Sequence, residues 1–368
     1  MSTKKDKFNY KDKLYMNLAL NLASDHIGLT GENPSVGCVI VKNNNLISIG
    51  QTSLNGRPHA EFNAIKQGKK NLSGSTMYVT LEPCNHYGKT PPCTNYIIKN
   101  KLKEVIYSIN DIDERTRGQS SMILKSKNIK VKKGLLNKKT KQLYESYFVN
   151  KKNNIPFVTG KVAITKNNLI YSQKQKKITN IYSDKFSHLL RYKNDSILIS
   201  YKTLNKDNPK LDCRLNGLEN FSPKRIILDK NLKTRTSSYI FKSAKYINTI
   251  VFYNNAPSNR IKLFSKKGIK LIKLNLNQNN DFDLKIILKK LYLFGCRNLL
   301  VEGGKDLSTN FLKNKLFNQF YLFKNSMNLS KIGQYKDFNP LKYLSKNYRY
   351  KSKINTYLDK DTIYLYKN

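Results

Sequence analysis

Three short segments in the first third of the chain carry residue types that can hold a metal ion and move a proton. They are His59-Ala60-Glu61, Glu82-Pro83-Cys84 and Cys93. One imidazole and two thiolates suit Zn²⁺, and three protein ligands leave a fourth tetrahedral position for water, which is typical of a catalytic zinc. The metal lowers the pKa of that water from about 15.7 towards 7. We therefore predict hydrolytic chemistry at a zinc site, in which Glu61 takes the proton of the water and passes it to a departing amine.

The order of these residues matches the His-x-Glu…Pro-Cys signature of zinc-dependent nucleobase deaminases. That signature has two residues between its cysteines, whereas eight separate Cys84 from Cys93 here. The two cysteines can still bind the same metal ion if Cys84 ends a strand and Cys93 begins the next helix. Free main-chain amides at that helix N-terminus favour a thiolate. The other cysteines have no such spacing, and we interpret them as structural: Cys38, Cys213 and Cys296.

Alternating helices and strands must position these segments. Leu14, Leu18 and Leu22 lie four residues apart and predict an amphipathic helix over residues 12–24. The other elements expected here are strands at 37–41, 46–50, 77–81 and 104–109 and helices at 60–68 and 94–101. Strands that alternate with helices in this way are typical of a three-layer α/β sandwich.

A polar, turn-rich stretch at residues 149–156 (VNKKNNIP) interrupts this pattern, and we place a domain boundary there. The expected domains are residues 1–150 and 151–368. The second domain should contain strands at 157–164, 196–200, 225–229, 249–253, 298–302 and 362–366 and helices at 184–192, 284–294 and 306–313. It reads as a second α/β domain, although the sequence after residue 323 shows little pattern.

Composition limits the function classes. The 368 residues are 39% hydrophobic, which is enough for two folded cores, and no apolar run is long enough to span a membrane. The odd number of cysteines and the charged N-terminal segment favour a cytoplasmic protein. Lysine and arginine number 68 against 24 acidic residues, a net charge of +44. This charge is diffuse, so we interpret it as solvated surface and not as a nucleic-acid-binding face.

The long segment between Cys84 and Cys93 also shows a family resemblance. Residues 82–93, EPCNHYGKTPPC, resemble the EPC-x-HxG[RK]TPPC segment of the bifunctional riboflavin-biosynthesis deaminase/reductases. The resemblance extends to residues 33–39 (NPSVGCV) and 58–61 (PHAE) in the first half of the chain. In the second half, residues 207–214 (DNPKLDCR) and 301–304 (VEGG) resemble the reductase motifs of that family.

The resemblance implies two folds and two activities. A cytidine-deaminase-like three-layer α/β/α sandwich would deaminate 2,5-diamino-6-(5-phosphoribosylamino)pyrimidin-4(3H)-one. A dihydrofolate-reductase-like α/β domain would then use NADPH to reduce the ribosyl group of 5-amino-6-(5-phosphoribosylamino)uracil to ribityl. The implied partners are this small phosphorylated pyrimidine, with neither membrane nor nucleic acid, and further copies of the chain in a homo-oligomer.

The same resemblance assigns residues to the two sites. The zinc ligands are His59, Cys84 and Cys93, and Glu61 is the proton shuttle. The implied substrate-binding residues are Asn33, His86, Lys89, Leu211, Arg214 and Glu302. The implied NADPH-binding residues are Ala163, Thr203, Asp207, Gly303 and Gly304. These residue types suit the roles: an asparagine amide can pair with a pyrimidine edge, and glycines before a helix let a phosphate approach free amides.

Several residues depart from the family pattern in the second half. Residues 165–168 (TKNN) replace a Ser-Leu-Asp-Gly turn, Lys177 stands where the family has tryptophan, and Asn208 replaces an aspartate. One alternative is therefore a deaminase whose second domain no longer reduces. A further alternative is a nucleic-acid base deaminase that uses the basic surface.

Overall fold

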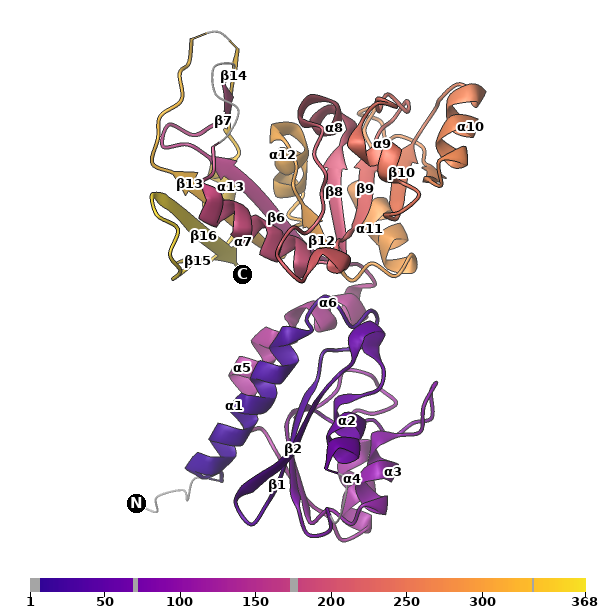
Figure 1. The fold of residues 1–368 in the computed structure, drawn as a ribbon, viewed down its shortest axis with the longest axis vertical. Helices are drawn as coiled ribbons and strands as arrows, with labels where there is room; N and C mark the ends of the chain where they lie inside the picture. Colours follow the sequence, from indigo (N-terminus) through magenta and orange to yellow (C-terminus); the bar gives the residue numbers. More distant parts are fainter. Residues whose placement is uncertain (1–6, 69–71, 173–177, 333) are drawn as a thin grey trace. The chain divides into compact units, whose positions relative to one another are not determined.

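The computed structural model describes residues 7–68, 72–172, 178–332 and 334–368 (Figure 1). The chain forms two compact units, Met1–Asn154 and Ile155–Asn368. The change from one unit to the other falls inside the polar stretch 149–156. Within the described ranges, no helix has the length and apolar character needed to cross a membrane.

A five-stranded sheet forms the middle layer of the first unit, with strand order β2-β1-β3-β4-β5. β1 is antiparallel to β2 and β3, whereas β3, β4 and β5 run parallel. The strands are β1 (Gly37–Lys42), β2 (Asn45–Gln51), β3 (Thr76–Leu81), β4 (Glu104–Ile109) and β5 (Lys130–Lys133). Because parallel strands end at the same edge of a sheet, the loops that follow β3, β4 and β5 lie together, where α/β folds commonly bind ligands.

Helices cover both faces of this sheet (Figure 1). On one face lie α1 (Tyr10–Asp25) and α5 (Asn137–Leu143), which contact each other. On the other lie α2 (Ala60–Gln67), α3 (Cys93–Lys99) and α4 (Gln119–Ser126), and α6 (Glu145–Asn153) follows α5. A 3-10 turn at Leu54–Gly56 precedes α2. The three-layer α/β/α sandwich predicted from the sequence is confirmed.

Helix α1 shows how close packing selects the buried face. The buried apolar side chains of α1 are Met16, Ala19, Leu20 and Ala23, whereas Leu14, which we expected on the apolar stripe, is 52% exposed. The cause is the small side chains of the two alanines. A Cβ at Gly37 of β1 would lie 1.9 Å from the carbonyl oxygen of Ala19, so the helix rests directly on the strand backbone.

A second glycine contact places the helix that carries two of the predicted active-site residues. A Cβ at Gly50 of β2 would lie 2.2 Å from the carbonyl oxygen of Ala60, the first residue of α2. The strand and the helix therefore meet backbone to backbone. This contact holds the N-terminus of α2, with His59 before it and Glu61 in its first turn, against the sheet.

The second unit is built on a nine-stranded sheet of order β11-β10-β9-β8-β12-β6-β13-β16-β15. The strands from β11 to β13 run parallel, and β16 and β15 add an antiparallel edge. The strands are β6 (Phe157–Ile164), β8 (Ser196–Ser200), β9 (Lys224–Leu228), β10 (Thr249–Tyr253), β11 (Lys270–Lys273), β12 (Asn298–Val301), β13 (Gln319–Asn325), β15 (Tyr350–Lys353) and β16 (Asp361–Lys367). A separate ribbon pairs β7 (Leu169–Ser172) with β14 (Tyr335–Asp337).

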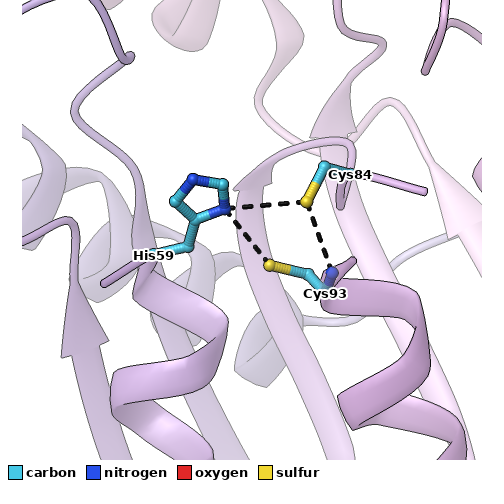
Figure 2. Close-up of side chains that lie close together, drawn as sticks. All are labelled: His59, Cys84 and Cys93. Carbon is cyan, nitrogen blue, oxygen red and sulfur yellow. Dashed lines mark hydrogen bonds between the residues drawn. The ribbon is translucent and has the colours of Figure 1, made fainter. Parts of the chain in front are cut away.

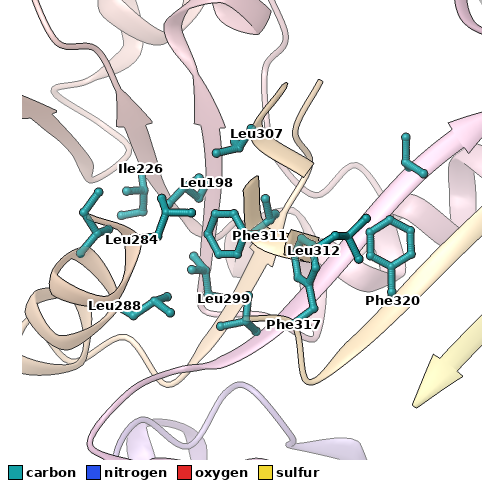
Figure 3. Close-up of a cluster of buried hydrophobic side chains, with 14 of the residues drawn as sticks. Leu198, Ile226, Leu284, Leu288, Leu299, Leu307, Phe311, Leu312, Phe317 and Phe320 are labelled. Atoms are coloured by element: carbon teal, nitrogen blue, oxygen red, sulfur yellow. The ribbon is translucent and has the colours of Figure 1, made fainter. Parts of the chain in front are cut away.

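Two hydrophobic cores sandwich the larger sheet. Leu198 and Leu299 face one core with α11 and α12 (Figure 3), whereas their neighbours Ile197 and Leu300 face the other. Alternate residues of a strand point to opposite faces, so a strand covered on both faces is apolar throughout. The helices of this unit are α7 (Ile181–Tyr192), α8 (Tyr201–Asp207), α9 (Tyr239–Ser243), α10 (Ser258–Lys266), α11 (Leu284–Leu293), α12 (Lys305–Lys313) and α13 (Leu341–Asn347), with a 3-10 turn at Glu219–Phe221.

The strands predicted in the second domain are confirmed as β6, β8, β9, β10, β12 and β16, each within one residue at either end. Helix α7 begins three residues earlier than predicted, because Asn180 caps it by accepting a hydrogen bond from the amide of Ser183. The stretch after residue 323, which shows little pattern, contains β14, α13 and β15. These short elements have few buried residues, so no apolar periodicity marks them.

Candidate active sites

The three predicted zinc ligands converge in the first unit (Figure 2). His59 caps the N-terminus of α2, Cys84 follows β3, and Cys93 is the first residue of α3. Nδ1 of His59 lies 3.6 Å from Sγ of Cys84 and 3.4 Å from Sγ of Cys93. All three donor atoms lie within 4.8 Å of one another. One imidazole nitrogen and two sulfurs at this spacing fit a tetrahedral zinc ion with one open position.

The two thiols differ in their affinity for a proton. A hydrogen bond from the thiol of Cys93, with help from His59 and the Cys93 amide, lowers the pKa of Cys84 to about 4. The same hydrogen bond and full burial raise the pKa of Cys93 well above its usual value. Without a metal, the pair therefore shares one proton, with Cys84 as the thiolate. A zinc ion would displace that proton because both sulfurs bind the metal as thiolates.

Glu61 lies beside this cluster in the first turn of α2 and is 4% exposed. Burial is the main reason that the pKa of Glu61 rises to about 7, and the neighbouring Cys84 thiolate raises it further, against the opposing charge of His59. A carboxyl group with a pKa near 7 can both accept and donate a proton at neutral pH. The geometry and the acidity both suit the predicted proton shuttle.

A cavity of about 120 Å³ opens onto His59, Glu61 and Cys84. Of the substrate-binding residues implied for this half, Asn33 and His86 line the cavity. The Asn33 amide donates to the carbonyl of Gly56 at 2.9 Å, which leaves its Oδ1 as the available acceptor. Lys89 is exposed in the loop before α3 and is not among the residues that line the cavity.

The wall of this cavity contains a pair of buried acids that sequence reasoning missed. Glu82 accepts hydrogen bonds from the amides of Gly118 at 3.0 Å and Asp111 at 3.3 Å, while its Oε1 is buried without a partner. Asp111 accepts from the hydroxyl of Tyr147 at 2.9 Å. Burial raises the pKa of both carboxyl groups. Their position just after β3 and β4, at the carboxyl edge of the sheet, was the available signal.

Three cations also line this cavity and were missed for a different reason. They are Arg57, Arg115 and Lys151, which come from segments far apart in the sequence. Arg57 donates to Oγ1 of Thr90 at 2.7 Å and so ties the loop before His59 to the loop before Cys93. Arg115 is paired with Asp113. In a chain with 68 basic residues, no sequence signal distinguishes these three from surface charge.

The second unit has a larger cavity, of about 320 Å³, at the carboxyl ends of β6, β8 and β12. It brings together most of the residues that the sequence analysis assigns to cofactor and substrate. These are Ala163, Thr203, Asp207, Leu211, Glu302, Gly303 and Gly304. Arg214 is not among the lining residues and forms an ion pair with Asp212.

The turn at Gly303 and Gly304 leaves open space around the N-terminus of helix α12. Gly304 caps the nine-residue helix, and a Cβ on it would lie 3.4 Å from Oγ1 of Thr203. A Cβ on Gly303 would lie 3.0 Å from the side chain of Leu307. A larger residue would therefore narrow the space over the free amides of the helix. This cradle fits a phosphate group of a dinucleotide such as NADPH.

Glu302 and Lys161 place opposite charges inside this cavity. Arg191 donates to Glu302 from Nε to Oε1 at 2.8 Å and from Nη2 to Oε2 at 2.9 Å. Burial alone would raise the pKa of Glu302, but attraction to Arg191 and Lys161 lowers it to about 2. Burial lowers the pKa of Lys161, with Glu302 opposing. The sequence analysis missed Lys161, although a lysine within an apolar strand is a recognisable signal.

The departures from the family pattern have local structural roles. Asn167 accepts from Thr165 at 2.6 Å and donates to the carbonyl of Leu329 at 2.8 Å, so the substituted turn is well formed. Asn208 adopts a left-handed conformation with φ of 43° and accepts from the amide of Tyr239 at 2.8 Å. Lys177 lies outside the described residues.

Comparison with protein families matches both halves of the chain. Residues 9–109 match the cytidine and deoxycytidylate deaminase zinc-binding region. Residues 170–331 match the RibD C-terminal domain. The first match contains the ligand cluster, and the second contains most of the larger cavity.

Relatives and solved structures cover nearly the whole chain. The riboflavin biosynthesis protein RibD of Aquifex aeolicus is 35% identical over 85% of this chain and 86% of its own. RibD of Actinobacillus pleuropneumoniae is 32% identical over 84% and 82%. The structure of Acinetobacter baumannii RibD (form 1) aligns with a TM-score of 0.83 and 26% identity over 97% of this chain and 98% of that one. A Thermotoga maritima diaminohydroxyphosphoribosylaminopyrimidine deaminase/5-amino-6-(5-phosphoribosylamino)uracil reductase aligns with a TM-score of 0.80 and 28% identity over 97% and 99%.

Proposed function

The chain belongs to the RibD family of bifunctional riboflavin-biosynthesis deaminase/reductases, and we propose that its two cavities perform the two reactions with the residues described above. As a RibD enzyme it combines a cytidine-deaminase-like domain that uses zinc with a dihydrofolate-reductase-like domain that uses NADPH. We assign the deaminase to residues 1–150 and the reductase to residues 151–368. Neither the deaminase-only alternative nor the nucleic-acid alternative is favoured by the family match.

The observation that carries the deaminase assignment is the meeting of His59, Cys84, Cys93 and Glu61 in one cavity. The zinc ion, when bound by the first three, supplies an activated water at neutral pH. Glu61 accepts the proton of that water and returns it to the amino group that leaves the pyrimidine as ammonia. In the metal-free protein, burial raises the pKa of Glu61 to about 7, which shows that this carboxyl group lies in an environment where it can hold a proton.

Two further groups would orient the pyrimidine. The free Oδ1 of Asn33 accepts a hydrogen bond from a ring N–H or exocyclic amine. His86 lines the cavity, and its Nδ1 forms a hydrogen bond with Thr116 at 3.1 Å, so its Nε2 is the ring nitrogen left for the substrate. We keep Lys89 as the partner of the substrate phosphate, because the loop that carries it also carries His86 and leads to Cys93. Its side chain is exposed, so its ammonium group is available to an anion.

The reductase assignment is supported by the cradle at Gly303 and Gly304. NADPH, when bound, supplies a hydride. The amides of α12 and the hydroxyl of Thr203 hold a phosphate of the cofactor, and Ala163 and Asp207 line the space for the rest. The substrate sugar lies against Leu211 and Glu302, with Arg214 as the partner for its phosphate. Lys161, a partly buried residue that lines the same cavity as Glu302, delivers the one proton that accompanies the hydride.

Product analysis tests both assignments. Zinc-loaded protein is given the diaminopyrimidinone ribosylamino phosphate with and without NADPH, and the products are identified by mass spectrometry. We expect the deaminated product alone without NADPH and the deaminated, reduced product with it. The Glu61→Gln variant should deaminate about 10²–10⁴-fold more slowly, but it should still reduce added 5-amino-6-(5-phosphoribosylamino)uracil. Failure of the parent protein to turn over either substrate would refute the proposal.

We also propose that the enzyme is cytoplasmic and forms a homo-oligomer, as the family resemblance implies. All five cysteines are free, and the two ligand thiols must stay reduced to bind zinc. Sedimentation at several protein concentrations tests the second part, and a single species at the mass of one chain would contradict it.

A further inference from the structure

A second cleft lies in the first unit, next to the deaminase cavity. It has a volume of about 830 Å³ and lies where β4 and β5 end, at residues 108–112 and 133–134. β4 and β5 are neighbouring parallel strands. The carboxyl ends of such strands are where α/β sheets bind small ligands. Asp111 belongs to the walls of both the cleft and the deaminase cavity, while none of the zinc ligands lines the cleft.

Basic side chains surround this cleft. Five of its lining residues are cationic, namely Lys7, Arg117, Lys133, Lys141 and Lys152. Arg117 and the three lysines after it are exposed. Within the described part of the chain, these four side chains form no ion pair. They come from four separate segments, so the fold, and not a run of sequence, brings them together.

The cleft offers these cations no internal counter-charge. Of its described lining residues, only Asp111 is acidic, and it is 9% exposed. Asp111 Oδ1 accepts from the hydroxyl of Tyr147 at 2.9 Å and from the amide of Asp113 at 3.1 Å, and this one buried carboxyl group is too few to balance the surrounding cations. Like charges around a concave surface repel one another, and an anion bound among them relieves that repulsion.

The floor of the cleft is apolar. Ile109, Ile112 and Phe148 contribute to it, and each is only partly exposed or buried. Gly134 adds open space, since a Cβ built on it would meet nothing within 4 Å. A hydrophobic floor with an aromatic ring suits a flat heteroaromatic group, and the volume lies within the range of about 300–1,000 Å³ that is typical of small-molecule sites.

The charge of the whole chain argues against a second copy as the occupant. At +44, another copy of this protein would bring more positive charge to a face that already lacks anions. A phosphorylated small molecule supplies both the charge for the rim and the ring for the floor. We propose that this cleft binds a phosphorylated aromatic ligand of the nucleotide class, at a site separate from the two reaction cavities.

Fluorescence titration with N-methylanthraniloyl-ADP tests this proposal on the full zinc-loaded chain. Saturating NADP⁺ is present throughout, so that the reductase cofactor site is occupied. The test variant is Lys133→Gln with Lys141→Gln. The matched control is Lys99→Gln with Lys103→Gln, which removes the same charge from the same unit near the opposite end of β4. All substituted lysines are exposed, so both variants should fold.

We expect parent and control to bind the probe alike and the test variant to bind it at least tenfold more weakly. Unlabelled ADP should displace the probe better than inorganic pyrophosphate, because only ADP has a ring for the apolar floor. Deaminase and reductase kcat/KM should be the same in all three proteins.

Four results would overturn the proposal. The first is failure of the parent to bind the probe at all while the reductase cofactor site is filled, and the second is equal loss of binding in control and test variants. The third is a raised deaminase KM in the test variant, which would make the cleft part of the substrate site. The fourth is tight binding of a single-stranded 20-nucleotide RNA, lost in the test variant, with no binding of the nucleotide probe.

Discussion

Arg191 on α7 and Glu302 at the end of β12 form a two-pronged ion pair although they lie 111 residues apart in the sequence. Their side chains are 12% and 13% exposed, so the pair is largely shielded from water. Through it, a helix packed on one face of the sheet fixes the carboxylate at the rim of the reductase cavity. The charge and position of Glu302 therefore depend on a residue that does not line that cavity.

Removing the cation from this pair should destabilise the second unit. Arg191→Met leaves a buried carboxylate without its partner, and breaking a buried pair in this way costs about 3 kcal/mol. The pKa of Glu302 lies below its usual value of 4.5, so the pair stabilises the parent fully above about pH 4.5. That stability is lost as the pH falls towards 2. Urea unfolding followed by circular dichroism at several pH values should show this dependence in the parent only.

Arg115→Gln provides the matched control for this experiment. Arg115 also pairs with an aspartate, but its side chain is 63% exposed, and exposed pairs contribute at most about 1 kcal/mol. Equal destabilisation by the two substitutions would contradict the role given to burial. The reductase kcat/KM should fall in Arg191→Met and stay at the parent level in Arg115→Gln.

Glu61→Gln should separate proton transfer from metal binding. Glutamine has nearly the same shape but cannot accept the proton of the water, so deamination should fall by about 10²–10⁴-fold. Zinc content, measured by plasma mass spectrometry, should remain at one ion per chain because Glu61 is not among the three ligands. Loss of zinc together with activity would instead make Glu61 a ligand or a structural residue.

The raised pKa of Glu61 also predicts a pH-dependent effect on stability. Its folded value of about 7 lies above the usual 4.5, so burial penalises the charged form. The metal-free parent should therefore lose stability as the pH rises from about 4.5 through 7. Metal-free Glu61→Gln lacks this group and should be more stable than the metal-free parent at pH 8, by about 3 kcal/mol. Equal unfolding midpoints at pH 8 would contradict the buried, raised-pKa environment.

Removal of zinc should destabilise the first unit and abolish deamination while the reductase still works. The ligands come from the start of α2, the end of β3 and the start of α3, so the metal links three elements. Dialysis against a chelator should lower the first thermal transition in calorimetry, and added zinc should restore it. Cys93→Ser should behave like the metal-free protein, whereas Cys213→Ala, in the other unit, should keep its zinc. An unchanged transition after zinc removal would contradict the structural part of this role.

The sequence was sufficient to predict that the three candidate zinc ligands lie together, because they belong to short motifs with a specific order. His59, Glu61, Cys84 and Cys93 occur in an order and within elements that few other sites share, and the strands around them have strong apolar patterns. The same patterns located the central parallel strands of the second unit. Contacts between residues that lie far apart in the sequence could not be predicted from such local patterns. The Arg191–Glu302 pair depends on two segments far apart in the chain, and nothing local marks either residue as a partner.

Charge caused the other gaps between sequence and structure. In a chain with 68 basic residues, a functional cation looks like any surface lysine. Arg57, Arg115 and Lys151 were therefore missed at the deaminase cavity, whereas Lys89 was selected only because its loop resembles the family segment. The buried face of helix α1 was predicted wrongly for a different reason. Its small alanines let the helix backbone pack directly against Gly37, and this contact decides which side of the helix is buried.

The position of Lys89 leads to the last prediction, which concerns the substrate phosphate. Lys89→Gln should raise the deaminase KM about tenfold with kcat nearly unchanged, since a charge-assisted hydrogen bond contributes about 1.5 kcal/mol or more to binding. The effect should vanish with a substrate that lacks the phosphate. Lys151→Gln is the matched control, because Lys151 is also an exposed lysine and it lines the cavity. If Lys151→Gln raises KM for the phosphorylated substrate and Lys89→Gln does not, the substrate phosphate is bound by Lys151 in the last turn of α6. The loop before Cys93 would then not bind it.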